Sequence, residues 1–409
     1  MNLIEKAAKI LEEPVCDHCL GRQFGMLLSG YTNDERGRML RNIVAMAVDA
    51  KIAKADMSNF HNYKFHDEEA IKKFTKQKKK CAICNDIFEN LDIYVKQIQN
   101  IVKKNKIEFR TFLVGTQLPF DLIEKEEKLW ERVGIDYCEP LKAELNREIG
   151  KLVEKIIKVR CNLKRPDVNF VVDIGRNKIK LEIMPVFIYG EYQKLIRGIP
   201  QTKWPSGKYK TSVEQIIAKP FLSAFVAKEQ KFHGSGREDI DARCLAWRPF
   251  VLEILEPKKR NIKDLNKLSK KIPKNKIRVR NLRLSDIIEV RKLKEERSNK
   301  VYRAVVVCDK KIKKDDLKKL KNLVGKIKQK TPQRVLHRRA NKIRDRNLIS
   351  IKSKFINDKK FIIEARCDAG LYIKELISGD NGRTKPSISE LLGTNCKCIE
   401  LDVIKIIKG

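Results

Sequence analysis

The segment whose side chains could most readily do chemistry runs from Gly234 to Arg243, as Gly-Ser-Gly-Arg-Glu-Asp-Ile-Asp-Ala-Arg. It places Glu238, Asp239 and Asp241 close to two arginines. Glycines let the backbone adopt positive φ and approach a ligand closely, and catalytic side chains often lie on loops held by rigid elements. A solvated charged turn would have a similar composition. The segment is therefore a candidate active-site loop, and its three carboxylates are the candidate working acids.

Two Cys-x-x-Cys pairs near the N-terminus could hold a metal ion. They are Cys16 with Cys19, and Cys81 with Cys84. Four thiolates can surround Zn²⁺ tetrahedrally at about 2.3 Å and leave no open position for a catalytic water. The chain has 11 cysteines, an odd number, and no sign of secretion, which disfavours a disulfide framework. We therefore expect a structural zinc site, with a chance pairing of two unrelated knuckles as the alternative.

The charge of the chain indicates a polyanionic partner. Lysine and arginine number 90 against 53 acidic residues, a formal net charge of +37 over 409 residues. Such an excess is typical of proteins that bind nucleic acid. No apolar run approaches the ~18 residues that span a bilayer, and residues 1–14 lack the apolar region of a signal peptide. We expect a cytoplasmic protein that does not associate with membranes.

The elements predicted beside the candidate loop are a helix before it and a strand after it. Apolar residues recur at helical spacing from Val213 to Lys231, which predicts one amphipathic helix. A strand is predicted from Pro249 to Glu256. The loop should therefore connect a helix to a strand.

Helices and strands alternate in the N-terminal half. The predicted elements are, in order, a helix over 85–104, a strand over 108–115, helices over 120–133 and 141–159, and strands over 167–174 and 178–185. Turn residues from Arg197 to Pro205 then predict a domain boundary.

The candidate loop resembles a known signature. Gly236-Arg237-Glu238-Asp239 is similar to the Gly-Arg-x-Asp signature of pseudouridine synthases, in which the final aspartate is the essential catalytic residue. The longer strings 231–243 and 248–254 resemble one branch, the archaeal and eukaryotic enzymes of the TΨC loop of tRNA, which carry an N-terminal zinc and THUMP region. The resemblance implies that Asp239 is catalytic, either as a nucleophile or as the base of an elimination.

Two further motifs follow in the family's order. Lys300 to Cys308 opens like the second motif, with a basic residue and then a tyrosine, and 370–376 resembles the third, Gly-x-Tyr-Ile-Lys/Arg-x-Leu. The third motif implies a cation beside the catalytic aspartate, and such a cation favours the charged carboxylate. By resemblance Lys374 would pair with Asp239, and Leu376 would close the uracil pocket. The full set of substrate-binding residues that the resemblance implies is Arg237, Tyr302, Tyr372, Lys374 and Leu376.

The resemblance also implies an α+β fold of several domains. We expect a zinc-binding region over 1–88 and a THUMP-like α/β RNA-binding region over 89–197, which a generic α/β module would also fit. A catalytic domain with a mixed or antiparallel sheet flanked by helices should occupy 198–409. Within it, Thr331 to Arg339 is predicted to be an extended stretch that lays arginines along phosphates.

The function that these motifs imply is isomerisation of uridine to pseudouridine in the TΨC loop of tRNA, at uridine-55 and, as in archaeal relatives, uridine-54. No organic cofactor is expected, and the chain should act as a monomer. Other THUMP enzymes need a glycine-rich or ATP-binding loop, and Gly234-Ser235-Gly236 should lack the strand before it and the helix after it that such a loop requires. The alternative function is a non-catalytic, zinc-containing tRNA-binding protein or RNA chaperone.

Overall fold

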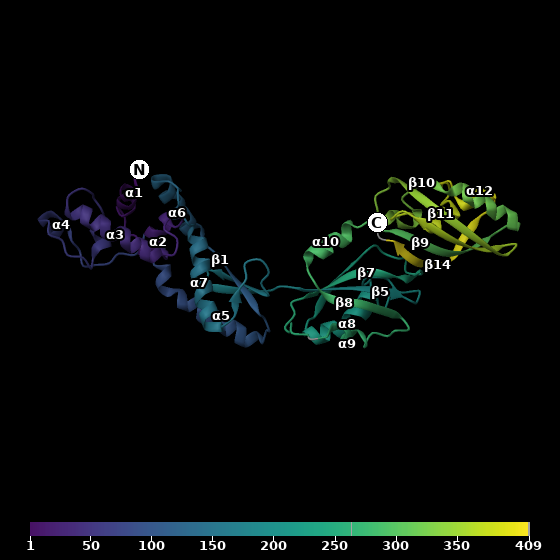
Figure 1. Ribbon diagram of the computed structural model, residues 1–409, viewed down its shortest axis with the longest axis horizontal. Helices are drawn as coiled ribbons and strands as arrows, with labels where there is room; N and C mark the ends of the chain where they lie inside the picture. The colour runs from purple at the N-terminus through teal and green to yellow at the C-terminus, as the bar shows by residue number, and fades with distance from the viewer. Residues whose placement is uncertain (263, 408–409) are drawn as a thin grey trace. The chain divides into compact units, whose positions relative to one another are not determined.

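The structure is a computed structural model that describes residues 1–262 and 264–407 (Figure 1). Its contacts divide the chain into two compact units, with the division between Met184 and Pro185. Each unit has its own hydrophobic core. Among the described residues, no helix combines the length and the apolar character needed to cross a bilayer.

The first unit combines α-helices with a four-stranded sheet. The helices are α1 (Leu3–Ile10), α2 (Asp17–Gly21), α3 (Asn33–Asp49), α4 (Glu68–Lys73), α5 (Leu91–Asn105), α6 (Phe120–Val133) and α7 (Leu141–Ile157). The strands are β1 (Thr111–Gln117), β2 (Arg160–Cys161), β3 (Val168–Asp173) and β4 (Lys178–Ile183), in the order β2-β1-β3-β4. β1 is parallel to β2 and β3, whereas β4 is antiparallel to β3.

Side-chain periodicity explains why these segments form these elements. In α7 the apolar residues recur at every fourth position and are fully buried: Leu141, Leu145, Ile149 and Val153. In β3 they alternate with half-exposed residues, as in a strand with one buried face: Val168, Phe170 and Val172. The helices and strands predicted between residues 85 and 185 are confirmed, with ends that shift by a few residues.

Two glycines allow α2 and α3 to pack closely beside the first cysteine pair. A Cβ atom on Gly37 would lie 2.0 Å from the backbone oxygen of Asp17, and one on Gly21 would lie 1.8 Å from that of Asn33. Backbone atoms cannot yield as a flexible side chain can, so larger residues would force the helices apart. This contact therefore fixes the position of α2, whose N-cap residue is Cys16.

The second unit is built on a ten-stranded sheet. Its order is β13-β10-β11-β12-β9-β14-β7-β5-β8, and β6 pairs with β7 off this path. The pairing of β14 with β7 is parallel and the others are antiparallel. The strands are β5 (Val186–Lys194), β6 (Glu229–Gly234), β7 (Arg243–Leu255), β8 (Ile277–Ser285), β9 (Asn299–Cys308), β10 (Gly325–Lys330), β11 (Ile343–Asn357), β12 (Lys360–Cys367), β13 (Thr384–Lys385) and β14 (Cys396–Ile407).

Helices cover both faces of this sheet. They are α8 (Val213–Phe225), α9 (Leu265–Ser269), α10 (Ile287–Glu295), α11 (Ile373–Ser378) and α12 (Ile388–Leu392), with the 3-10 helices η4 (Lys314–Leu323) and η5 (Gln333–Arg338). α8 and α9 pack on the side of β7 that carries Phe250 and Leu252, and α10 packs on the side that carries Val251 (Figure 1). The predicted α+β class and the mixed, mainly antiparallel sheet are confirmed.

The structure corrects the predicted helix before the candidate loop. α8 ends at Phe225, because Val226 adopts a left-handed conformation with φ 49°. Strand β6 begins at Glu229, so Glu229 to Lys231 are in a strand, and within it the Phe232 ring stacks on Phe250 with 5.1 Å between centroids. The candidate loop therefore connects two strands, β6 and β7. We predicted that the Gly-Ser-Gly turn has no strand before it and no helix after it. The first part is wrong, because β6 precedes the turn, and the second is confirmed, because strand β7 follows it.

Two further predictions differ from the structure. Residues 331–339 are not extended: Pro332 begins the 3-10 helix η5, and the backbone nitrogen of Thr331 bonds the carbonyl of Lys342, so the segment turns back on itself. The expected boundary between 197 and 198 also differs from the division at 184/185. Strand β5 pairs with β7 and β8, which places residues 185–197 in the second unit.

Replacing Gly37 with alanine should destabilise the first unit. The added methyl group meets the Asp17 backbone, and such overpacking should cost at least about 2 kcal/mol of unfolding free energy. The matched control is Gly150→Ala in α7, where nothing lies within 4 Å of the added atom, so that it should stabilise the helix by up to about 1 kcal/mol. Thermal unfolding of both variants measures this, and equal midpoints would contradict the close-packing argument.

Candidate active site

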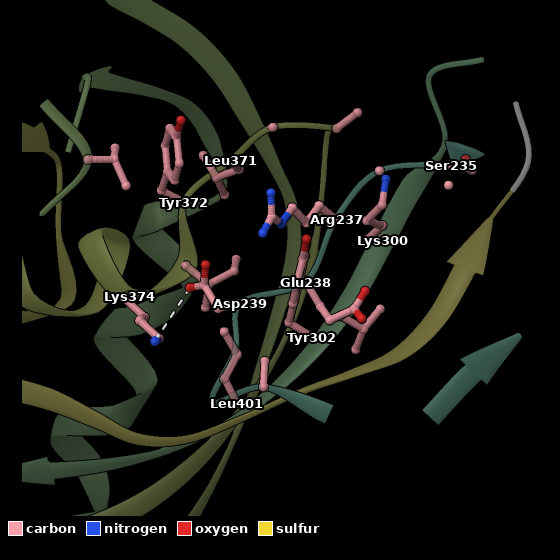
Figure 2. Close-up of a pocket in the computed structure, with 18 of the residues that line it drawn as sticks. Ser235, Arg237, Glu238, Asp239, Lys300, Tyr302, Leu371, Tyr372, Lys374 and Leu401 are labelled. Carbon is pink, nitrogen blue, oxygen red and sulfur yellow. Dashed lines mark ion pairs between the residues drawn. The ribbon is translucent and has the colours of Figure 1, made fainter. Parts of the chain in front are cut away.

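Residues of all three motifs line one pocket in the second unit. The pocket measures about 890 Å³, and Figure 2 shows the side chains that surround it. The loop between β6 and β7, the start of β9 and the segment before α11 each contribute to the wall. The motifs therefore converge in space although they are far apart along the chain.

Asp239 lies in this pocket between two cations. Its side chain is 34% exposed, and Oδ2 lies 3.4 Å from Lys374 Nζ (Figure 2). Arg334 contacts both carboxylate oxygens, with Nη1 3.3 Å from Oδ1 and Nη2 3.2 Å from Oδ2. The geometry thus gives Asp239 two positive neighbours, of which the family resemblance implied only Lys374.

Lys374 is shared between two carboxylates. Its Nζ lies 2.7 Å from each carboxylate oxygen of Asp241, closer than it lies to Asp239. Burial alone would raise the pKa of Asp241, but the hydrogen bond and charge of Lys374 outweigh burial and lower the pKa. Asp241 is therefore a partner of Lys374 with a 68% exposed side chain.

Glu238, the neighbour of Asp239, points away from solvent. Its carboxylate is fully buried, forms an ion pair with Arg248 Nε at 3.1 Å, and accepts a hydrogen bond from the Tyr192 hydroxyl at 3.0 Å. Arg248 Nη1 also donates to the Ser235 carbonyl at 2.7 Å, which ties β7 to the start of the loop. Because both Arg248 and Tyr192 bind the buried Glu238 carboxylate, this side chain stabilises the loop and does not face the pocket solvent.

Further contacts hold the loop backbone itself. Lys194 on β5 is fully buried, and its Nζ donates to the carbonyls of Asp239 at 3.2 Å and Ile240 at 2.9 Å. Burial lowers the pKa of Lys194 to about 8. Gly236 adopts φ +78°, and a Cβ atom there would lie 3.0 Å from Arg248 Nη1. The loop conformation around Asp239 is therefore set by both hydrogen bonds and close packing.

Two tyrosines and an arginine complete the polar lining. Tyr302 on β9 is largely buried, and this burial raises the pKa of its phenol. Tyr372 accepts a hydrogen bond from Arg339 Nη1 at 2.7 Å, and Gln329 bonds its backbone nitrogen and oxygen at 2.9 and 3.0 Å. Arg237 is exposed, and its guanidinium points to the side of the pocket where Tyr372 lies (Figure 2).

Leu376 does not line the pocket. It is fully buried in the core of the second unit, one turn into α11. The apolar residues that line the pocket include Leu371, Leu401 and Val403, of which the last two come from β14. The expectation that Leu376 closes the uracil pocket is therefore not supported by its position.

The sequence analysis did not identify Arg334 as a neighbour of Asp239. Its only signal was the cluster of arginines between 331 and 339, which we assigned to phosphate binding as a group. The contact joins residues 95 positions apart, and it depends on the turned conformation of η5. Neither feature leaves a local pattern in the sequence.

The four predicted metal ligands come together in the first unit. The sulfur atoms of Cys16, Cys19, Cys81 and Cys84 all lie within 4.8 Å of one another, with 3.6 Å between Cys16 and Cys84. A tetrahedral zinc–thiolate site with bonds of about 2.3 Å has sulfur–sulfur edges of about 3.8 Å, so the cluster fits such an ion. His18 is not part of the cluster: its Nδ1 bonds Glu144 at 2.9 Å and its ring stacks on Phe88.

Breaking the buried ion pair should loosen the loop that carries Asp239. In an Arg248→Met variant the Glu238 carboxylate stays buried without a compensating charge, which should cost about 3–5 kcal/mol. A Tyr192→Phe variant keeps this ion pair; it removes the hydrogen bond to the same carboxylate and the one that the hydroxyl accepts from Gln201, and should cost about 1–3 kcal/mol. Urea unfolding of both proteins compares them. An Arg248→Met protein as stable as wild type would refute the role of this pair.

Comparison with known proteins agrees with the motifs. Residues 187–407 match the family model described as Pus10, C-terminal, and residues 94–173 match that of the Pus10 THUMP domain, archaeal.

Several archaeal relatives named tRNA pseudouridine synthase Pus10 match along nearly the whole chain. The Pyrococcus furiosus protein is 40% identical over 99% of this chain and 98% of its own length. The Methanocaldococcus jannaschii protein is 41% identical over 96% and 92%, respectively, and that of Methanopyrus kandleri is 38% identical over 96% and 95%. The chain therefore belongs to the Pus10 family of pseudouridine synthases, the enzyme family that its motifs predicted.

Proposed function

We propose that this protein isomerises uridine to pseudouridine in tRNA, with Asp239 as the catalytic residue. Family membership supports the reaction, and the names of the relatives support tRNA as the substrate. The observation that carries the assignment of Asp239 is its position. Of the three acids in the loop, Glu238 is buried in an ion pair and Asp241 is paired with Lys374, whereas Asp239 faces the pocket between two cations.

The reaction breaks the N-glycosidic bond of the uridine, rotates the uracil, and rejoins it to the ribose through a carbon atom. It is an isomerisation, so no group enters or leaves and no redox partner is needed. An ionised carboxylate next to the ribose could start it, either by attack on the sugar or by removal of a proton. In both routes Lys374 and Arg334 lie beside the Asp239 carboxylate and contact its oxygens.

The remaining pocket residues have roles that fit a flipped nucleotide. Extruding a base costs a few kcal/mol, least where the base is already unpaired. Tyr302 and Tyr372 offer faces and hydroxyl groups to a base, and Leu371 offers an apolar wall. Arg237 is exposed at the pocket and can contact a phosphate or fill the space that the flipped base leaves.

The site of modification that we propose is uridine-55 of the TΨC loop, together with uridine-54. The proposal rests on the family motifs from 231 to 254, which resemble the enzymes of that loop. The net charge of +37 favours a substrate with many phosphates. Binding should therefore weaken steeply as salt rises.

Incubation of unmodified tRNA with the purified protein, without any added cofactor, should produce pseudouridine at positions 54 and 55. Site-resolved pseudouridine mapping measures it, and a tRNA with cytidine at both positions is the control. Product at another position would retain the reaction but refute the proposed site. Tight, salt-dependent binding without any product would refute the reaction itself and favour a non-catalytic tRNA-binding protein.

We further propose that the four-cysteine cluster binds zinc and that the zinc is structural. When bound, the ion would be enclosed by four thiolates, which leave no position for a reacting water. Its contribution would be folding energy, because the ligands come from α2 and its N-cap and from a distant segment at 81–84. None of the 11 cysteines, all within the described residues, forms a disulfide, and we propose a reducing compartment such as the cytoplasm.

A Cys81→Ser variant should lose zinc and melt at a lower temperature than wild type, because removal of a ligand removes folding energy. The matched control is Cys161→Ser, since Cys161 is exposed on β2 and lies outside the cluster. Elemental analysis should find about one zinc per chain in wild type and in the control. Native protein without zinc would contradict the assignment.

A further inference from the structure

Arg334 lies at the centre of a chain of charges that begins in the protein core and ends at Asp239. Its Nε contacts Glu375 Oε1 at 2.7 Å, and its two terminal nitrogens contact the two oxygens of Asp239 at 3.3 and 3.2 Å. Glu375 is only 4% exposed. The guanidinium therefore joins a buried carboxylate on one edge to a pocket carboxylate on another.

The buried end of this chain fixes the arginine. A carboxylate such as that of Glu375 is costly to bury unless a positive partner compensates it, and its second oxygen has no hydrogen-bond partner among the described residues. Arg334 supplies the charge. Burial of Arg334 opposes its own charge, but Glu375 and Asp239 outweigh this effect and raise the pKa of the guanidinium. The buried Glu375 carboxylate therefore fixes the position of the Arg334 guanidinium.

The pocket end of the chain orients Asp239. Two parallel contacts from a planar guanidinium restrain the rotation of a carboxylate, which a single ammonium contact does not. Lys374 approaches one oxygen of Asp239 at 3.4 Å, but lies 2.7 Å from both oxygens of the exposed Asp241. Of these two cations, Arg334 is therefore the one whose geometry defines the plane of the Asp239 carboxylate.

We propose that Arg334, held in place by Glu375, is a positioning residue that orients the Asp239 carboxylate for the reaction. This inference rests on the proposed function, in which Asp239 is the catalytic residue. Misplacing a reacting group by about 1 Å can cost about 100-fold in rate. Loss of Arg334 should therefore lower the rate of the chemical step much more than it lowers the affinity for tRNA.

The test compares single-turnover rates of pseudouridine formation at saturating tRNA with dissociation constants measured separately. Arg334→Gln should lower the rate by about 100-fold. Its dissociation constant should stay within about threefold of that of a charge-matched control, Lys352→Gln, an exposed residue of β11 outside the pocket lining. Arg334→Lys should be intermediate, because it restores the charge but not the two-pronged contact.

Glu375 provides the second part of the test. If Glu375 acts through Arg334, Glu375→Gln should slow the reaction, and the double variant with Arg334→Gln should be no slower than Arg334→Gln alone. If the rate loss of the double variant equals the product of the two single losses, Glu375 and Arg334 act independently. That result would overturn the proposal that Glu375 acts through Arg334. If Arg334→Gln fails to fold, Arg334→Lys decides: it must react more slowly than wild type at an unchanged dissociation constant.

A normal rate at saturating tRNA, combined with weaker binding, would show that Arg334 is only a phosphate ligand and would overturn the inference. Asp239→Asn is measured alongside to separate the two claims. An Asp239→Asn protein with the wild-type rate would refute the proposed function itself. An inactive Asp239→Asn protein beside a fully active Arg334→Gln protein would refute only the role of Arg334.

Discussion

The buried ion pair between Glu238 and Arg248 anchors the loop that carries Asp239, the proposed catalytic residue. Arg248 holds the Glu238 carboxylate inward, whereas the side chain of its neighbour Asp239 lies in the pocket between Arg334 and Lys374. The Tyr192 hydroxyl and the Lys194 ammonium add hydrogen bonds to the same loop from β5. Strand β5, which pairs with β7, therefore contacts both the side chain of Glu238 and the backbone of Asp239.

The electrostatics of the pocket follow from this arrangement. Asp239 is held by two cations from different segments, and each cation has a second acidic partner, Asp241 for Lys374 and Glu375 for Arg334. Each of the two cations is therefore held by an acid in addition to Asp239.

Much of this site could be predicted from the sequence, because the motifs carry it. Asp239, Tyr302, Tyr372 and Lys374 all line the same pocket, and their own short motifs identified them. The four cysteines were found in the same way, since ligand spacing is a local pattern. The alternation of apolar residues likewise predicted β3 and β4, and their helical spacing predicted α6 and α7.

What the sequence could not predict depends on tertiary contacts. The helix before the loop was predicted to reach Lys231, but it ends at Phe225, where Val226 adopts a left-handed conformation, and β6 begins at Glu229. Leu376 belongs to the third motif but faces the core, because α11 begins only at Ile373 and turns its side chain away from the pocket. The approach of Arg334 to Asp239 depends on how η5 turns back, which no local pattern records.

The central claim is that the Asp239 carboxylate performs the chemistry in this pocket. The most direct measurement is the single-turnover rate of pseudouridine formation by Asp239→Asn at saturating tRNA, with the affinity for tRNA measured on the same protein. The substitution keeps the shape of the side chain and removes its charge. The account predicts that binding persists while pseudouridine formation is lost. Formation at the wild-type rate would contradict it and would transfer the chemistry to another acid of the loop.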